Sequence, residues 1–108
     1  LYRELHPAVL KLIKMTIDAG TAHNIPVTMC GEMASRIDAI PLLVGLGLNG
    51  FSVVPPRVAR VKKMIAELDY SECRTLADRL MKLATTEKIE AVLQNWIEAH
   101  VSKEFLED

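Results

Sequence analysis

The sequence is poor in the residues that mark several specialised classes of protein. Two cysteines, Cys30 and Cys73, among 108 residues are too few for the disulfide framework of a secreted domain, and no signal-peptide pattern opens the chain. Because 13 lysines and arginines face 14 acidic residues, no excess of positive charge is available to bind nucleic acid or an anionic membrane. We therefore predict a cytoplasmic protein that binds no nucleic acid.

Long hydrophobic runs are missing as well. Charged residues interrupt the first half at Lys11, Lys14, Asp18, Glu32, Arg36 and Asp38. No stretch reaches the roughly 18 apolar residues that a membrane-spanning helix needs, and no membrane insertion is expected. What the sequence does contain is apolar side chains. Half of its residues are hydrophobic, which is enough for one domain whose core needs no disulfides.

Apolar and charged residues are distributed unevenly along the chain. Most charges lie from Arg57 onward, whereas apolar stretches fill the first half. Strands buried on both faces form near-continuous apolar runs, and surface helices keep a polar face. The first half therefore predicts a covered sheet, and the second half predicts a set of exposed helices. Residues 1–5 lack an initiator Met and lead straight into an apolar pattern, which suggests a piece of a longer protein.

Hydrophobic spacing predicts a helix and two strands in the first half. Apolar residues recur at helical spacing over 7–23, and Asn24 and Pro26 end that helix. Residues 27–30 and 51–54 are short apolar and β-branched runs, the pattern of buried strands.

Further helices are predicted between and after the strands. Asp38 is the expected N-cap of a helix that ends in the glycine-containing stretch 45–50. A third helix follows the second strand over 58–68. Ser71 and Thr86 are the expected N-caps of the last two helices.

The order of these elements indicates an α/β fold. A strand, a crossover helix and a second strand imply parallel pairing. Two parallel strands form a poor sheet alone, because parallel sheets are covered on both faces and have more strands. We therefore expect further strands beside these two, and self-association of the isolated chain through free strand edges and apolar faces. The tail from His100 onward is expected to fray.

Ligands of parallel α/β folds gather at the carboxyl ends of the strands. Here those ends are residues 29–33 and 54–57. Arg57, at the start of a helix, is either a contact for a phosphate near the positive end of the helix dipole or a solvated surface residue. The glycines of 45–50 lie at the opposite end of the sheet, where a helix stop and a tight turn explain them better than a phosphate-binding loop.

Cys30 carries the most chemistry at the first of these ends. Beside the flexible Gly31 and the acidic Glu32, its thiol could be a nucleophile, an acid or a metal ligand, or it could pack as a small buried hydrophobe. A metal is the weakest of these alternatives, because no second Cys or His stands at zinc spacing. No function is expected of Cys73, which falls in the first turn of a charged helix.

Three segments, in order, carry a family resemblance: Thr28-Met29-Cys30-Gly31-Glu32-Met33-Ala34, the run 39–48, and Phe51-Ser52-Val53. Together with residues 6–14 and the helix over 56–65, they resemble the C-terminal portion of the enzyme I family of the bacterial sugar phosphotransferase system, which belongs to the phosphoenolpyruvate (PEP)-utilising enzymes. Two departures from the family pattern are Thr28, where Gly is usual, and Ala34-Ser35-Arg36, where Ala-Gly-Asp is common.

The resemblance implies a fold. The PEP-binding domain of the family is a (β/α)8 TIM barrel, and this chain would supply its last two βα units with flanking helices. Residues 1–70 would hold the two units, and 71–108 would be the C-terminal helices of the same domain. The alternatives are a fragment of pyruvate phosphate dikinase or PEP synthase, and a module whose helices over 71–99 serve mainly in dimerisation. A homodimer is implied in either case.

The resemblance also implies a chemistry. In the family, the phosphoryl group of PEP passes to an enzyme histidine and on to a phosphocarrier protein, and pyruvate is released. Cys30 would protonate the methylene carbon of enolpyruvate, since a thiol in water is mostly protonated at neutral pH. Gly31 would let the backbone approach the substrate, and Glu32 would hold the loop or orient the thiol. The family's Mg²⁺ ligands and phosphorylated histidine have no counterpart here, so the chain alone is expected to bind no metal and to be inactive.

Overall fold

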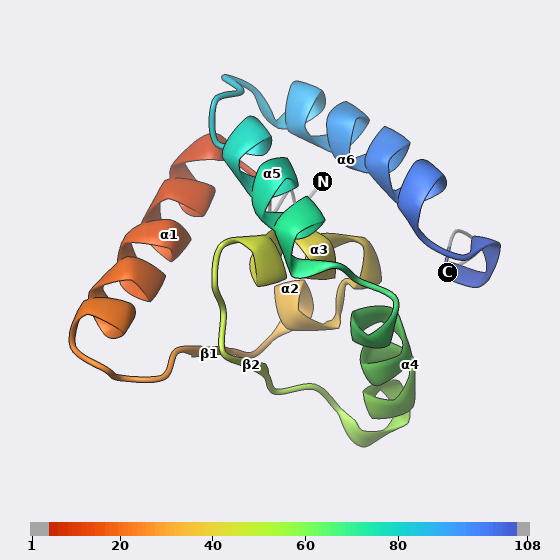
Figure 1. Cartoon of the computed structure of the whole chain (residues 1–108), viewed down its shortest axis with the longest axis horizontal. Helices are drawn as coiled ribbons and strands as arrows, with labels where there is room; N and C mark the ends of the chain where they lie inside the picture. Colours follow the sequence, from red (N-terminus) through yellow and green to blue (C-terminus); the bar gives the residue numbers. More distant parts are fainter. Residues whose placement is uncertain (1–4, 106–108) are drawn as a thin grey trace.

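The computed structural model describes residues 5–105, and for Glu32 and Ser35 the backbone alone. A short two-stranded sheet lies between α1 and α4, and α2, α3, α5 and α6 are stacked on one side of it (Figure 1). In chain order the elements are α1 (Pro7–Ala22), β1 (Thr28–Met29), α2 (Glu32–Ser35), the 3-10 helix η1 (Ile37–Ala39), α3 (Ile40–Gly45), β2 (Gly50–Phe51), α4 (Pro55–Ala66), α5 (Tyr70–Leu80), α6 (Thr86–His100) and the 3-10 helix η2 (Lys103–Phe105).

Helix α1 begins and ends as the sequence predicts. His6 is its N-cap, and the Nδ1 atom of His6 accepts a backbone N–H of the first turn at 3.0 Å. At the other end Asn24 has a φ of 57°, and Ile25 N donates to Gly20 O at 2.8 Å. This arrangement, with a left-handed residue after the last turn, is a common helix stop. The predicted helix over 7–23 is confirmed.

The two strands pair in parallel, which confirms the predicted pairing. Thr28 lies opposite Gly50 and Met29 opposite Phe51. Ser52 N extends the ladder by donating to Met29 O at 2.8 Å. The carboxyl ends of the two strands therefore lie side by side.

The predicted burial of the strands is wrong for this chain. The strands are two residues long rather than four, and Thr28 and Cys30 are exposed, whereas Met29 and Phe51 are half-buried. Within residues 5–105 the sheet has only these two strands. Their side chains therefore lack the neighbouring strands and the second cover that a buried parallel sheet has.

The apolar first half is explained mainly by α3, which lies at the centre of the core. Five of its six residues are buried, and the sixth is half-buried. A helix that is apolar all round is covered on all sides. The stretch 45–50 ends this helix: Gly47 has a φ of 97°, and Leu48 N donates to Leu43 O at 3.1 Å. The interpretation of this stretch as a helix stop and a tight turn is confirmed at Gly47, whereas Gly45 is the last residue of α3 and Gly50 begins β2.

The predicted N-cap of this helix is wrong. Asp38 lies inside η1, and Ala39 precedes α3 with no side-chain cap. The carboxylate of Asp38 instead accepts hydrogen bonds from the guanidinium of Arg36. A charged donor two residues away binds this carboxylate in place of a neutral backbone N–H, since hydrogen bonds between ionised partners are the stronger ones.

The last two helices also use neighbouring residues as caps. Asp69, not Ser71, is the N-cap of α5 and accepts from Glu72 N at 3.0 Å. Thr85, not Thr86, is the N-cap of α6. Both caps have extended backbone angles, whereas the predicted residues already lie inside their helices.

The C-terminal segment returns to α4. Ser102 donates to both carboxylate oxygens of Glu67, from N at 2.9 Å and from Oγ at 2.8 Å. Arg60 Nη2 donates to Glu104 O at 2.9 Å, and Phe105 is buried in the core. The prediction of a frayed tail is wrong for residues 101–105, and 106–108 lie outside the described residues.

Candidate functional site

Cys30 lies at the carboxyl end of β1, at an edge that it shares with β2. Ser52 N donates to Met29 O, so Cys30, which follows β1, and Ser52, which follows β2, lie side by side. Cys30 is exposed, so the alternative that it packs as a buried hydrophobe is wrong. Its thiol is accessible to a molecule bound at this edge of the sheet.

The surroundings of Cys30 are apolar. With residues of α1 and β1 and with Leu48, it lines a groove of about 360 Å³. The α1 side of this groove is formed by Leu12, Ile13, Thr16 and Ile17. The hydroxyl of Thr16 donates to Leu12 O at 2.9 Å and so satisfies its own donor. This wall can exclude water from one side of the thiol, and the polar groups that would bind a charged ligand must come from elsewhere.

Gly31 turns the chain away from the sheet after Cys30. Its φ is 87° and its ψ is −163°, a region of backbone conformation that is essentially restricted to glycine. A Cβ atom added here would meet no described atom within 4 Å. Glycine is therefore required by the conformation of this turn rather than by crowding, and the open space beside it is available to a ligand.

Glu32 opens the short helix α2 directly after this turn. Its side chain lies outside the described part of the structure, so the expected role in holding the loop or orienting the thiol stays a prediction. The next two residues, Met33 and Ala34, are buried. They fasten α2 to the core and thus fix the far side of the Cys30 loop.

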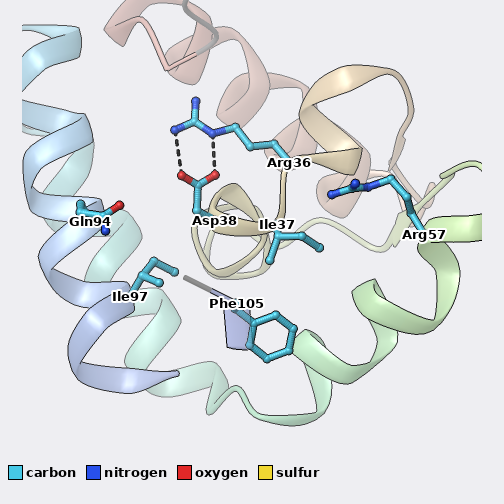
Figure 2. Close-up of a pocket in the computed structure, with 7 residues that line it drawn as sticks. All are labelled: Arg36, Ile37, Asp38, Arg57, Gln94, Ile97 and Phe105. Carbon is cyan, nitrogen blue, oxygen red and sulfur yellow. Dashed lines mark hydrogen bonds and ion pairs between the residues drawn. The ribbon is translucent and has the colours of Figure 1, made fainter. Parts of the chain in front are cut away.

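A polar pocket of about 250 Å³ begins at Arg36, the residue after α2 (Figure 2), and sequence reasoning missed it. Ile37 and Asp38 of η1, Arg57 of α4, Gln94 and Ile97 of α6 and Phe105 of η2 line it together with Arg36. In the sequence, the departure at Arg36 and the candidate phosphate contact Arg57 marked two of its residues, but nothing indicated that they share a pocket. The residues that α6 contributes could not be predicted, because α6 is far from Arg36 along the chain.

Arg36 carries the densest set of polar contacts in this pocket. Its guanidinium binds the Asp38 carboxylate through two parallel hydrogen bonds (Figure 2) and binds Glu90 of α6 through two more. Partial burial alone would lower the pKa of Arg36. The hydrogen bonds and charges of Asp38 and Glu90 outweigh this effect and hold the pKa above its ordinary value. The guanidinium is therefore a permanent cation shared by two carboxylates.

Arg57 is not the solvated surface residue that one interpretation of the sequence gave. It is half-buried and lies in the first turn of α4, where its backbone N donates to Val54 O at 2.9 Å. Its side chain lines the same pocket as Arg36 (Figure 2). The structure thus brings Arg57 to the polar pocket rather than to the groove beside Cys30.

The two cysteines lie in opposite environments. Cys73 is fully buried in α5, and burial, together with the nearby charges of Asp69 and Glu72, raises the pKa of its thiol to about 11.

Among the side chains that the structure describes, which do not include that of Glu32, no group of three or more His, Cys, Asp or Glu residues could hold a metal ion. Within residues 5–105, no helix is both long and apolar enough to cross a bilayer.

Comparison with known proteins places this geometry in a family. Residues 1–70 match the family described as PEP-utilising enzyme, PEP-binding domain. The chain is 44% identical over 96 residues to a phosphoenolpyruvate-protein phosphotransferase of Mycoplasma pneumoniae, and 38% identical over 96 residues to one of Staphylococcus carnosus. A third, of Haemophilus influenzae, is 37% identical over 97 residues. The matches cover 89–90% of this chain but only 17% of the length of each relative.

Proposed function

Because this chain belongs to the PEP-utilising enzymes, through their PEP-binding domain, we propose that it takes part in phosphoryl transfer from PEP to a protein. The three relatives are named for this activity. One observation in the structure carries the proposal: an exposed thiol, Cys30, stands at the carboxyl end of a parallel strand, followed by a turn that only glycine adopts. That edge of a parallel sheet is where ligands gather.

In the proposed reaction, PEP gives its phosphoryl group to an enzyme histidine, which passes it to a phosphocarrier protein. The enolate of pyruvate is left behind. The thiol of Cys30 then gives its proton to the methylene carbon, where the electron pair of the carbon–carbon double bond forms the new C–H bond. The enolate oxygen becomes the keto oxygen of pyruvate, and the thiolate takes a proton from water. The apolar groove beside Cys30 supports this role, because it limits the approach of water to one side of the thiol.

The three histidines of this chain are not assigned the phosphoryl group. His6 is the N-cap of α1, and His23 caps the opposite end. His100 stacks on Trp96 with ring centroids 4.1 Å apart. The phosphorylated histidine of the proposal is therefore a residue other than these three, and we expect the 108-residue chain alone to form no phosphohistidine from PEP.

Magnesium, which the family resemblance implies, is not assigned to this chain either. The described side chains do not fit it, because no three of their His, Cys, Asp or Glu groups come together, and Mg²⁺ needs several oxygen ligands. No step of the proposal passes through a metal bound here.

The two strands are proposed to be the last two of a (β/α)8 barrel. Two observations support this: both outer edges of the pair lack a partner among residues 5–105, and apolar grooves flank them.

Other parts of the proposal are the division of the domain at residue 70 and a location in the cytoplasm. The names of the relatives favour a phosphotransferase over pyruvate phosphate dikinase or PEP synthase.

A homodimer is also proposed, and the exposed apolar side chains do not favour α6 as its surface. Among the described residues, large exposed hydrophobic side chains lie on α1 and α4, at Tyr70 at the start of α5, and at Ile25 and Val54 outside the helices, and none lies on α6. The alternative that this chain is mainly a dimerising module of its last helices gains no support from that distribution.

A hybrid enzyme tests the proposal. The 96 matched residues of the Mycoplasma pneumoniae relative are replaced by those of this chain, and pyruvate release from PEP is measured. We expect the hybrid to be active and Cys30→Ala to lower kcat by about 10²- to 10⁴-fold, the usual contribution of a general acid. Cys73→Ala, which removes the buried thiol, is the matched control and retains activity.

The position of the proton provides a second readout. With the methyl homologue of PEP in D₂O, the active hybrid should place deuterium on one face of the enolate, giving one enantiomer of 2-oxobutyrate that carries a single deuterium at C3. Cys30→Ala should give a racemic product, because solvent then supplies the deuteron from both faces. Full facial selectivity in Cys30→Ala would rule out Cys30 as the donor.

A further inference from the structure

Arg36 joins two elements that lie far apart in the sequence. Its Nη1 atom donates to Glu90 Oε2 at 3.1 Å, and Nη2 donates to Glu90 Oε1. The partners are separated by 54 positions. The side chain of Arg36 is 23% exposed and that of Glu90 is 34% exposed, so solvent only partly screens the pair. Bidentate pairs of this kind fix geometry as well as adding energy.

The backbone of Arg36 is connected directly to the loop that carries Cys30. Arg36 is the C-cap of α2, and its N–H donates to Met33 O at 3.2 Å. Its carbonyl accepts from Ala39 N at 3.1 Å and so begins η1. Between Cys30 and Arg36 there are only the turn at Gly31 and the single turn of α2. A displacement of Arg36 therefore reaches the Cys30 loop through α2, whose Met33 and Ala34 are also held by burial in the core.

The end of α2 next to Gly31 is less constrained than its other end. The side of α2 next to Gly31 has no side-chain cap, and an added Cβ on Gly31 would contact nothing within 4 Å. The opposite end of α2 is held by Arg36, whose local partner Asp38 follows it by two residues. Asp38, in the adjoining η1, can orient the guanidinium but connects it only to the next turn of the chain. Among the described hydrogen bonds of Arg36, those to Glu90 connect it to an element distant in the sequence.

We propose that Arg36 and Glu90 are positioning residues, through which helix α6 sets the position of the Cys30 loop. The inference rests on the proposed function of Cys30 as a proton donor. A donor must lie within hydrogen-bond reach of the carbon that it protonates, and small displacements far from the reacting atoms reduce rates strongly. Helix α6 then helps to orient the Cys30 thiol toward the carbon that it protonates.

The first experiment needs no activity and uses the 108-residue chain. Hydrogen exchange is measured at the amides of Arg36 and Ala39, which report on α2 and η1. We expect Glu90→Gln and Arg36→Gln each to accelerate exchange at these amides roughly tenfold, as loss of a charge-assisted pair predicts. The double variant should exchange no faster than Arg36→Gln, because both changes remove the same connection, the pair between Arg36 and Glu90.

The control is Glu98→Gln, which makes the same change on the same helix. Glu98 accepts a hydrogen bond from Gln94 and does not contact Arg36, so exchange at Arg36 and Ala39 should match the unaltered chain. An equal acceleration at Leu46 and Met81, whose amides lie in other elements, would mean general destabilisation and would overturn the inference. So would unchanged exchange in Glu90→Gln.

The second experiment uses the hybrid enzyme. We expect Glu90→Gln to lower kcat about tenfold, with KM unchanged, and to reduce the facial selectivity of deuterium incorporation, whereas Glu98→Gln leaves both intact. Full selectivity in Glu90→Gln would overturn the positioning role while leaving the proposed function in place. A hybrid that fails with all residues unaltered contradicts the proposed function instead, and the exchange data still decide whether α6 holds α2.

Discussion

Cys30 and Cys73 show how differently two residues of one type are placed in a small chain. One is exposed at the end of a strand, and the other is fully buried between helices. We expect iodoacetamide to modify Cys30 alone in the folded chain, and both thiols in denaturant. Mass spectrometry of the alkylated peptides measures this directly. Rapid modification of Cys73 without denaturant would contradict the buried packing of α5.

The thiol of Cys73 also predicts a pH dependence of stability. Its pKa in the folded chain is about 11, raised from 9.0 by burial and by Asp69 and Glu72. Between these two values the unfolded chain loses a proton that the folded chain retains, so the free energy of unfolding should fall as the pH rises from 9 to 11, by about 2 kcal/mol. It should be unaffected by this group below pH 9. Urea titrations of Cys73→Ala, compared with the unaltered chain, isolate this contribution.

Gly31 provides a prediction about the loop itself. Because φ is 87° and ψ is −163°, Gly31→Ala should cost about 1–3 kcal/mol of strain or force the turn to change shape. Gly50→Ala is the control, since an added Cβ there meets only the Thr28 side chain, Oγ1 at 3.4 Å and Cγ2 at 3.8 Å. Thermal unfolding of the two variants should separate them, and equal melting temperatures would contradict the strained turn.

At this scale the sequence predicted the right kind of residue more often than the right position. Thr85 and Thr86 are equally good caps by composition, and the choice depends on which of them has an extended backbone. Asn24 was identified correctly because its position after the last turn is a local requirement. Glu90 as a partner of Arg36 could not be found, because nothing local to either residue indicates a contact across 54 positions.

Among the elements, α3 and α5 make the closest helix contact. A Cβ atom on Gly45 would lie 2.0 Å from Cys73 O, so only glycine allows the backbone of α5 to approach α3 at this point. We expect Gly45→Ala to destabilise the chain by about 3 kcal/mol, since backbone cannot give way as a side chain can. Melting temperature and urea midpoint measure the loss. A variant as stable as the unaltered chain would show that the two helices can separate without cost.

Element type was predictable where the hydrophobic period was clear, and α1, α4, α5 and α6 lie close to their predicted ranges. The single turn of α2 and the two 3-10 helices were missed, because segments of three or four residues carry no period. The apolar run through α3 predicts a buried segment, and five of its six residues are buried. An apolar run predicts burial, but it does not say how many neighbours surround the helix.

For the whole molecule, the exposed apolar side chains decide behaviour in solution. On α1, Leu12, in the wall of the groove beside Cys30, is 63% exposed, and Met15 is 66% exposed. The sheet beside them has two unpaired edges among the described residues. We expect the isolated chain to self-associate at micromolar concentration. The double substitution Leu12→Lys and Met15→Lys should shift it toward the monomer, as measured by light scattering.

The matched control adds the same number of lysines to a polar surface. Asn95→Lys with Ala99→Lys changes two exposed residues of α6 and should leave the association unchanged. A monodisperse monomer for the unaltered chain would contradict the prediction.

The architecture of the whole molecule was only partly predictable from the sequence. Parallel pairing followed from the order of elements, whereas no local pattern indicated that the end of the chain returns to α4.

That return has a consequence for cleavage. Ser102 binds Glu67 and Glu104 binds Arg60, across 35 and 44 positions, so α5 and α6 form a loop whose two ends are held together non-covalently. The connection between these helices is exposed at Lys82 and Ala84. A single tryptic cut after Lys82 should therefore leave two fragments that remain bound to each other and elute as one species, until denaturant separates them.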